Sequence, residues 1–164
     1  MTLGNRVAVM SEGIFQQVAP PMELYRRPVN EFVAGFVGSP AMNFFDCELG
    51  IEAALWRLTN DSLRLSLDGA GWREPAGRVT LGIRPHDIEL VAPEQGDARA
   101  RVDVVEPLGS EVLVHLELPS KAEAPFVRAI LSPEREINEG DEVGLHFPPE
   151  RVHLFDATSG KRLN

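Results

Sequence analysis

From residue 43 onward, apolar and polar residues alternate in short runs that are separated by turn-forming residues. The alternation is clearest at 79–83, 112–118 and 143–147, where the alternate positions are Val, Leu, Ile or Phe. Successive side chains of a strand point to opposite faces, so each run predicts a strand with one buried face. Further candidate strands lie at 43–49, 53–58, 62–67, 87–91, 100–106, 126–131 and 151–155.

These candidate strands follow one another at short spacing, and no amphipathic helical segment separates them. A parallel sheet would need such a crossover segment between consecutive strands. The pattern therefore predicts a mainly β fold, an antiparallel barrel or sandwich, for residues 41–164.

The first 40 residues have a different pattern. Residues 6–10 and 14–18 are rich in strand-forming residues and flank a short turn, which predicts a hairpin. Segments 21–27 and 31–37 predict two short helices, the first starting on proline and the second capped by Asn30.

The second predicted helix carries an apolar stripe formed by Phe32, Val33, Phe36 and Val37. Such a stripe needs a surface to pack on, and a hairpin with two short helices offers too little. We expect these four residues to contact a second copy of the chain or a missing domain, or else to be mobile.

Charge marks a boundary between the two patterns. Residues 1–40 hold three of the 16 basic side chains and three of the 25 acidic ones, so the whole net charge of −9 lies in residues 41–164. The Val-Gly-Ser-Pro segment at 37–40 breaks both helices and strands. We therefore predict two domains, 1–40 and 41–164.

The same composition excludes several classes of function. A net charge of −9 argues against nucleic acid and against anionic lipid, which both require clustered Lys and Arg. No apolar run approaches the roughly 20 residues of a membrane span. The single cysteine, Cys47, excludes an internal disulfide and fits a reducing compartment.

Motifs for catalysis are absent from the sequence. It contains no G-x-x-x-x-G-K-[ST] loop for nucleotide phosphates, no G-x-S-x-G elbow, and no H-E-x-x-H or C-x-x-C metal motif. The four histidines, His86, His115, His146 and His153, lack a second ligand at helical or zinc-finger spacing. We predict no catalytic residues and no metal site.

The segment 82–87, Gly-Ile-Arg-Pro-His-Asp, places three different polar side chains at a predicted strand end. Proline fixes the backbone there, with a guanidinium, an imidazole and a carboxylate around it. Either Arg84 pairs locally with Asp87, or Arg84, His86 and Asp87 form a contact surface for a partner or small ligand.

Several separated motifs resemble one known family. The segment 1–28, with Arg-Val-Ala-Val-Met at 6–10, resembles the end of an ABC transporter ATPase domain, and FVAGFVGSPAMNF at 32–44 resembles the junction that follows it in maltose-type carbohydrate importers. GIRP at 82–85, VEPLGSE at 105–111 and PERVHLFD at 149–156 are similar to the C-terminal regulatory (TOBE) domain of these importers, in the expected order.

This resemblance implies the C-terminal part of an ATP-binding subunit, with an OB-like barrel. Such a subunit dimerises, lies in the cytoplasm at the inner membrane, and powers sugar import through transmembrane permease subunits, with ATP and Mg²⁺ bound upstream of this region. His86 stands where the family commonly has glutamate. The candidates for regulatory or partner contacts are Arg84, His86, Asp87, Glu106, Ser110 and Arg151.

A second hypothesis is a stand-alone OB-type module that senses a small ligand, a sugar or an oxyanion. Sugar recognition would need aromatic side chains gathered on one strand face. Trp56 and Trp72 are the main candidates in the predicted barrel.

Overall fold

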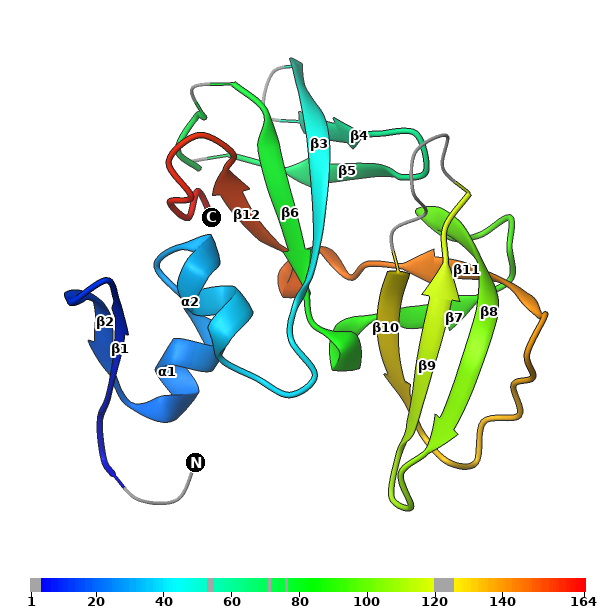
Figure 1. Ribbon diagram of the computed structural model, residues 1–164. Helices are drawn as coiled ribbons and strands as arrows, with labels where there is room; N and C mark the ends of the chain where they lie inside the picture. Colours follow the sequence, from blue (N-terminus) through cyan, green and yellow to red (C-terminus); the bar gives the residue numbers. More distant parts are fainter. Residues whose placement is uncertain (1–3, 53–54, 71, 76, 120–125) are drawn as a thin grey trace.

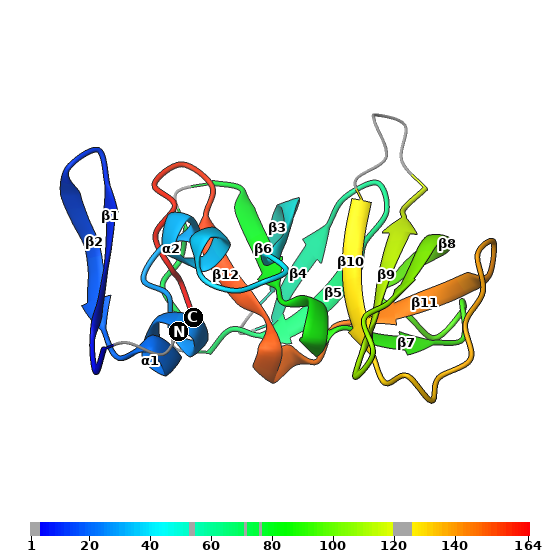
Figure 2. The same ribbon diagram turned by 60° about the horizontal axis from the view of Figure 1, so that its bottom comes forward.

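The computed structural model describes residues 4–52, 55–70, 72–75, 77–119 and 126–164. Two five-stranded antiparallel sheets make up most of the chain, and a two-stranded hairpin with two short helices lies beside the first sheet (Figure 1). In the turned view the hairpin, the helices, the first sheet and the second sheet follow one another in a row (Figure 2). The prediction of a mainly β, antiparallel fold is confirmed. Residues 53–54 of one predicted strand, and residues 1–3 of the N-terminal motif, lie outside the described residues.

The N-terminal elements form as predicted. Strands β1 (Val7–Ser11) and β2 (Ile14–Ala19) pair as a hairpin, and helices α1 (Pro21–Arg26) and α2 (Glu31–Phe36) follow. We call these four elements the N-terminal unit. Asn30 caps α2, because its side-chain oxygen accepts a hydrogen bond from the Val33 backbone N–H at 2.9 Å.

The apolar stripe of α2 is divided between the interior and the surface. Val33 and Val37 are buried in a small core with Val9, Ala19 and Leu24. The expectation that these two valines need a second copy or a missing domain is therefore wrong, because the hairpin and α1 cover them. Phe32 and Phe36 point outward, 44% and 70% exposed, with ring centroids 6.1 Å apart.

The first sheet has the strand order β12-β6-β3-β4-β5. Its strands are β3 (Asn43–Glu52), β4 (Leu55–Thr59), β5 (Arg64–Asp68), β6 (Val79–Ile83) and β12 (His153–Asp156). Strand β6 is buried on both faces. A Cβ at Gly82 would lie 2.6 Å from the Met42 sulfur, so this glycine lets side chains near α2 pack directly on the strand.

The second sheet has the order β10-β9-β8-β11-β7. Its strands are β7 (Glu89–Val91), β8 (Ala98–Pro107), β9 (Val112–Glu117), β10 (Phe126–Leu131) and β11 (Glu142–His146). The two sheets share one large apolar core, which includes Leu81, Leu116 and Phe147. A bridge between Leu63, just before β5, and Ala98, the first residue of β8, joins the two sheets.

Two predicted strands that come after a proline start later than the alternation suggests. Residues 85–87 and 149–151 form 3₁₀ turns, η1 (Pro85–Asp87) and η2 (Pro149–Arg151), before β7 and β12 begin. Both turns start on a proline, which lacks the backbone N–H that a strand ladder needs. Asp87 and Arg151 therefore lie on turns and not on strands.

The C-terminal tail returns to the N-terminal unit. The backbone N–H of Glu31 donates to the Gly160 carbonyl at 2.9 Å, and that of Arg162 donates to the Val29 carbonyl at 3.1 Å. The two regions of the chain are thus joined at their ends, and their division at residue 40 stays a prediction. In the described part of the chain, no helix is long and apolar enough to cross a membrane.

Candidate functional site around the first 3₁₀ turn

The turn η1 gathers four of the six contact residues predicted from the sequence. Strand β6 ends at Ile83, and Pro85 then redirects the backbone into the turn, which the Asp87 N–H closes on the Arg84 carbonyl at 3.0 Å. Arg84, His86 and Asp87 therefore project from one short turn in different directions, and Arg151 meets it from η2.

Arg84 points into the protein and is only 1% exposed. Its Nη1 donates to the Val37 carbonyl at 2.7 Å, and its Nε and Nη2 donate to the Tyr25 carbonyl at 3.2 and 2.5 Å. The guanidinium carbon also lies 3.6 Å from the centre of the Tyr25 ring, a cation–π distance.

These contacts correct one expectation. Arg84 neither faces a partner nor takes Asp87 as its hydrogen-bond acceptor, because the guanidinium is occupied by carbonyls of the N-terminal unit. Burial lowers the pKa of Arg84, while Tyr25 and Asp87 oppose that change. An arginine side chain stays charged despite such a shift.

His86 lies on the exposed side of η1. Its Nε2 is 3.4 Å from Oε1 of Glu111, and both side chains are nearly half exposed. Glu111 lies in the β8–β9 turn, and the exposed Ser110 precedes it. The turn also contains Gly109, whose φ of +91° is in the left-handed region. This contact joins η1 to the second sheet.

Asp87 is more enclosed than His86. Burial raises the pKa of its carboxyl, and the nearby Arg151, Arg84 and His86 oppose that change. Its Oδ1 lies 3.9 Å from Nη1 of Arg151, whose side chain is 62% exposed. The pair is loose, and Arg151 keeps most of its surface free for other contacts.

Glu106 lies apart from η1, on the outer face of the second sheet. Its Oε1 is 2.9 Å from Nε2 of His115 on β9, a close polar contact without hydrogen-bond alignment. The structure thus assembles Arg84, His86, Asp87 and Arg151, brings Ser110 near through Glu111, and leaves Glu106 separate.

The sequence did not single out Tyr25 or Glu111 as site residues, although both contact η1. Glu111 lies inside the VEPLGSE motif, so its position beside Ser110 was the available signal. The acceptors of Arg84 are backbone carbonyls, which every residue has, and no residue type could mark them.

The histidines do not come together as metal ligands. His146 contacts Asp97 at 3.0 Å, and His153 is buried on β12. Among the described residues, no three His, Cys, Asp or Glu side chains are placed to hold a metal ion. Cys47 is buried, and burial together with Asp46 raises the pKa of its thiol to about 12.

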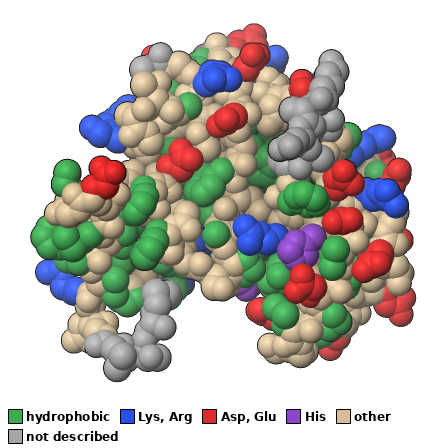
Figure 3. All heavy atoms as spheres, in the orientation of Figure 1, with side chains coloured by type: hydrophobic (Ala, Val, Ile, Leu, Met, Phe, Trp, Pro, Cys, Tyr) green, Lys and Arg blue, Asp and Glu red, His purple; other side chains and the backbone are tan. Residues whose placement is uncertain are grey.

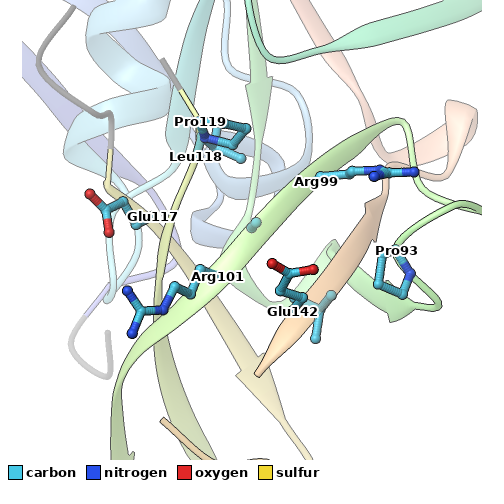
Figure 4. Close-up of a pocket in the computed structure, with 9 residues that line it drawn as sticks. Pro93, Arg99, Arg101, Glu117, Leu118, Pro119 and Glu142 are labelled. Atoms are coloured by element: carbon cyan, nitrogen blue, oxygen red, sulfur yellow. The ribbon is translucent and has the colours of Figure 1, made fainter. Parts of the chain in front are cut away.

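A separate cavity of about 380 Å³ opens beside β8 and the end of β9 (Figure 4). Two arginines and two glutamates alternate around it, and none of the described residues that line it is aromatic. Trp56 and Trp72 pack edge to face elsewhere, with Trp56 in the core. The lining residues are Pro93, Arg99, Ala100, Arg101, Glu117, Leu118, Pro119, Glu142 and Val143.

Comparison with known protein families identifies two domains in the chain. Residues 38–88 match the MalK OB fold domain, and residues 81–155 match the TOBE domain. The fold is also similar to the structure of the cytoplasmic molybdate-binding protein ModG with molybdate bound, with a TM-score of 0.52 over 68% of this chain and 94% of that one, at 14% sequence identity. The chain is thus an OB-type β protein with a TOBE domain, as predicted.

Longer relatives match nearly the whole chain. It is 38% identical to the xylose/arabinose import ATP-binding protein of Haloferax volcanii, 40% to the trehalose/maltose import ATP-binding protein of Thermococcus litoralis, and 38% to the sn-glycerol-3-phosphate import ATP-binding protein of Escherichia coli O157:H7. Each match covers 99% of this chain but only 43–45% of the relative. The chain thus matches the C-terminal OB and TOBE part of maltose-type ABC importer ATP-binding subunits.

Proposed function

We propose that the chain forms the regulatory and dimerisation part of an ABC sugar importer's ATP-binding subunit. The observation that carries this proposal is the joint match to the MalK OB fold and TOBE domains within an alignment over 99% of the chain. The chain spans less than half the length of the relatives, so ATP and Mg²⁺ would bind to another part of the subunit. The chain itself would hydrolyse no ATP.

The exposed residues around η1 are the proposed contact surface for regulatory partners. His86 and Arg151 offer partly exposed polar groups from two different turns, and Ser110 lies near them through Glu111. Glu106, on the outer face of the second sheet, is a separate candidate contact. Arg84 is not part of this surface, because it is buried.

The N-terminal unit would contact the ATP-binding part of such a subunit. Hydrophobic side chains gather over the hairpin and helices on the left of Figure 3. They include Ile14, Phe15, Phe32 and Phe36, with exposed fractions between 44% and 70%. A group of exposed large apolar side chains is typical of a protein contact. The assembled subunit would lie at the inner face of the membrane and act with transmembrane permease subunits.

A chimera tests the proposed function. The chain replaces the corresponding part of the T. litoralis relative, to which it is 40% identical. We expect the chimera to fold, to dimerise, and to hydrolyse ATP, whereas the chain alone gives no turnover above background. ATP hydrolysis by the isolated chain, or a folded chimera that stays monomeric, would contradict the proposal.

A further inference from the structure

Arg84 joins two parts of the fold that are distant in sequence. It follows directly on the end of β6, and its guanidinium contacts the carbonyls of Tyr25 on α1 and Val37 after α2. Tyr25 belongs to the last turn of α1, and Val37 is the C-cap residue of α2. One side chain therefore takes backbone carbonyls at the C-terminal ends of both helices.

The chemistry of this joint requires arginine. Carbonyl oxygens at helix C-termini carry partial negative charge, and a guanidinium offers several N–H donors in one plane that can also stack on a ring. Lysine has neither the planar donors nor the stacking surface.

Gly38 makes room for the Arg84 guanidinium. Gly38 has a φ of +125°, and a Cβ at this glycine would lie 2.9 Å from Nη1 of Arg84 and 3.4 Å from the Tyr25 ring. The absence of a side chain at residue 38 is what admits the guanidinium next to the Val37 carbonyl.

The N-terminal unit has a second attachment at the opposite end of α2. There the C-terminal tail supplies the Gly160 carbonyl to the Glu31 N–H and a bridge between Asn30 and Lys161. An attachment at one end of a helix allows rotation about that end, whereas attachments at both ends do not.

We propose that Arg84 is a positioning residue that fixes the orientation of the N-terminal unit on the two sheets, with the tail as the second anchor. This role does not depend on which partner binds at η1. Arg84, the buried arginine of the Gly-Ile-Arg-Pro motif, thus has a structural role, whereas the exposed residues around η1 form the proposed contact surface.

Pairs of spin labels test this proposal. Met22→Cys on α1, where the side chain is 52% exposed, and Glu139→Cys in an exposed loop before β11 place one label on each side of the joint. Cys47 is buried with a raised thiol pKa and remains unlabelled. Pulsed electron paramagnetic resonance then measures the distribution of distances between the labels.

We expect a narrow distribution for the parent protein and a broad one for Arg84→Ala and Arg84→Lys. The near-ultraviolet circular dichroism of the Trp56–Trp72 pair checks that the sheets stay folded. Arg57→Ala, which removes an exposed arginine paired with Glu52, is the matched control and should leave the distribution narrow. Guanidinium ion well below denaturing concentration should narrow the Arg84→Ala distribution, and sodium chloride should not.

A folded Arg84→Ala protein with the narrow parental distribution would overturn the proposal. If that variant does not fold, Arg84→Lys decides the question, since it keeps the charge and most of the side-chain volume. A parental distribution for folded Arg84→Lys would mean that the charge, the tail or the apolar packing of Ala34 on Met42 and Phe155 is enough to orient the N-terminal unit, and would equally overturn it.

Discussion

The side-chain amide of Asn43 joins the two sheets by hydrogen bonds. Its Nδ2 donates to the Arg128 carbonyl at 2.9 Å and to the Ile83 carbonyl at 3.3 Å, and its Oδ1 accepts from the Arg128 N–H at 2.9 Å. Asn43 is 6% exposed, so water cannot replace these bonds.

We expect Asn43→Asp to lower the free energy of unfolding by about 3 kcal/mol, since a carboxylate cannot donate to two carbonyls and is costly to bury. Urea unfolding monitored by tryptophan fluorescence measures the change. Asn138→Ala, at an exposed loop position, is the control and should change stability by less than about 0.5 kcal/mol. Equal stability of Asn43→Asp and the parent would show that the contact between the two sheets does not depend on this amide.

His153 gives the stability of the protein a specific pH dependence. Burial, and then the charges of Arg162 and Arg84, lower its pKa from 6.5 to about 4. Between these two values the unfolded chain binds more protons than the folded one, so stability falls as the pH falls. The loss attributable to this imidazole is up to about 3 kcal/mol.

The variant His153→Gln isolates this contribution, because glutamine does not titrate in the range. We expect the difference in unfolding free energy between the parent and this variant to shrink as the pH falls from 7 to 4, measured by urea titration at each pH. A difference that stays constant with pH would mean that His153 takes a proton as easily in the fold as in the unfolded chain.

At the scale of single elements, α2 depends on its N-cap. Asn30 accepts from the Val33 N–H at 2.9 Å and donates from Nδ2 to the Gln16 side chain at 2.9 Å, which ties the helix to the hairpin. Asn30→Ala should destabilise α2 by about 1 kcal/mol. Amide hydrogen exchange should then be faster across 31–37 and unchanged in β6, whereas equal protection of α2 in both proteins would contradict the role of the cap.

The elements themselves were largely predictable from the sequence. Period-two alternation marks a strand with one buried face, and Asn30 marks a helix start, so both patterns survive into the structure. The turns η1 and η2 were missed because a 3₁₀ turn before a strand leaves the apolar alternation of that strand intact. The prolines at 85 and 149 were the only local signal.

The candidate site was predictable only as a place along the chain. The polar residues of the 82–87 segment do gather at η1, but the sequence could not tell that Arg84 turns inward while His86 stays outside. That difference arises from Gly38 and two carbonyls that are 47 and 59 residues away in the chain. Long-range contacts of this kind leave no pattern in residue types.

At the scale of the whole molecule, two exposed apolar surfaces lie at opposite ends. One is on the N-terminal unit around Phe36. The other is the outer face of the second sheet. There His115 pairs with Val104 on one side and with Arg128 on the other. Phe126, which is 65% exposed, projects from the same face as Arg128. All of the net charge of −9 lies in residues 41–164, so two copies of the chain repel each other at low salt.

We expect the second-sheet surface to form the dimer and the Phe36 surface to remain free in this chain. Phe126→Asp should then weaken the dimer at least about tenfold, since it removes an apolar contact and adds negative charge. Phe36→Asp should leave the dimer unchanged, and neither exposed substitution should alter the unfolding midpoint of the monomer, measured at chain concentrations too low for dimerisation. Added salt should strengthen the parent dimer by screening the repulsion.

Sedimentation equilibrium over a range of chain and salt concentrations measures all of these effects. The reverse pattern, a dimer lost in Phe36→Asp and kept in Phe126→Asp, would place the second copy on the N-terminal unit. The apolar face of α2 would then be the dimer contact, and it could not at the same time cover an ATP-binding domain. Because Phe32 and Phe36 stack as one exposed surface, a single partner can occupy it, and this experiment decides which partner that is.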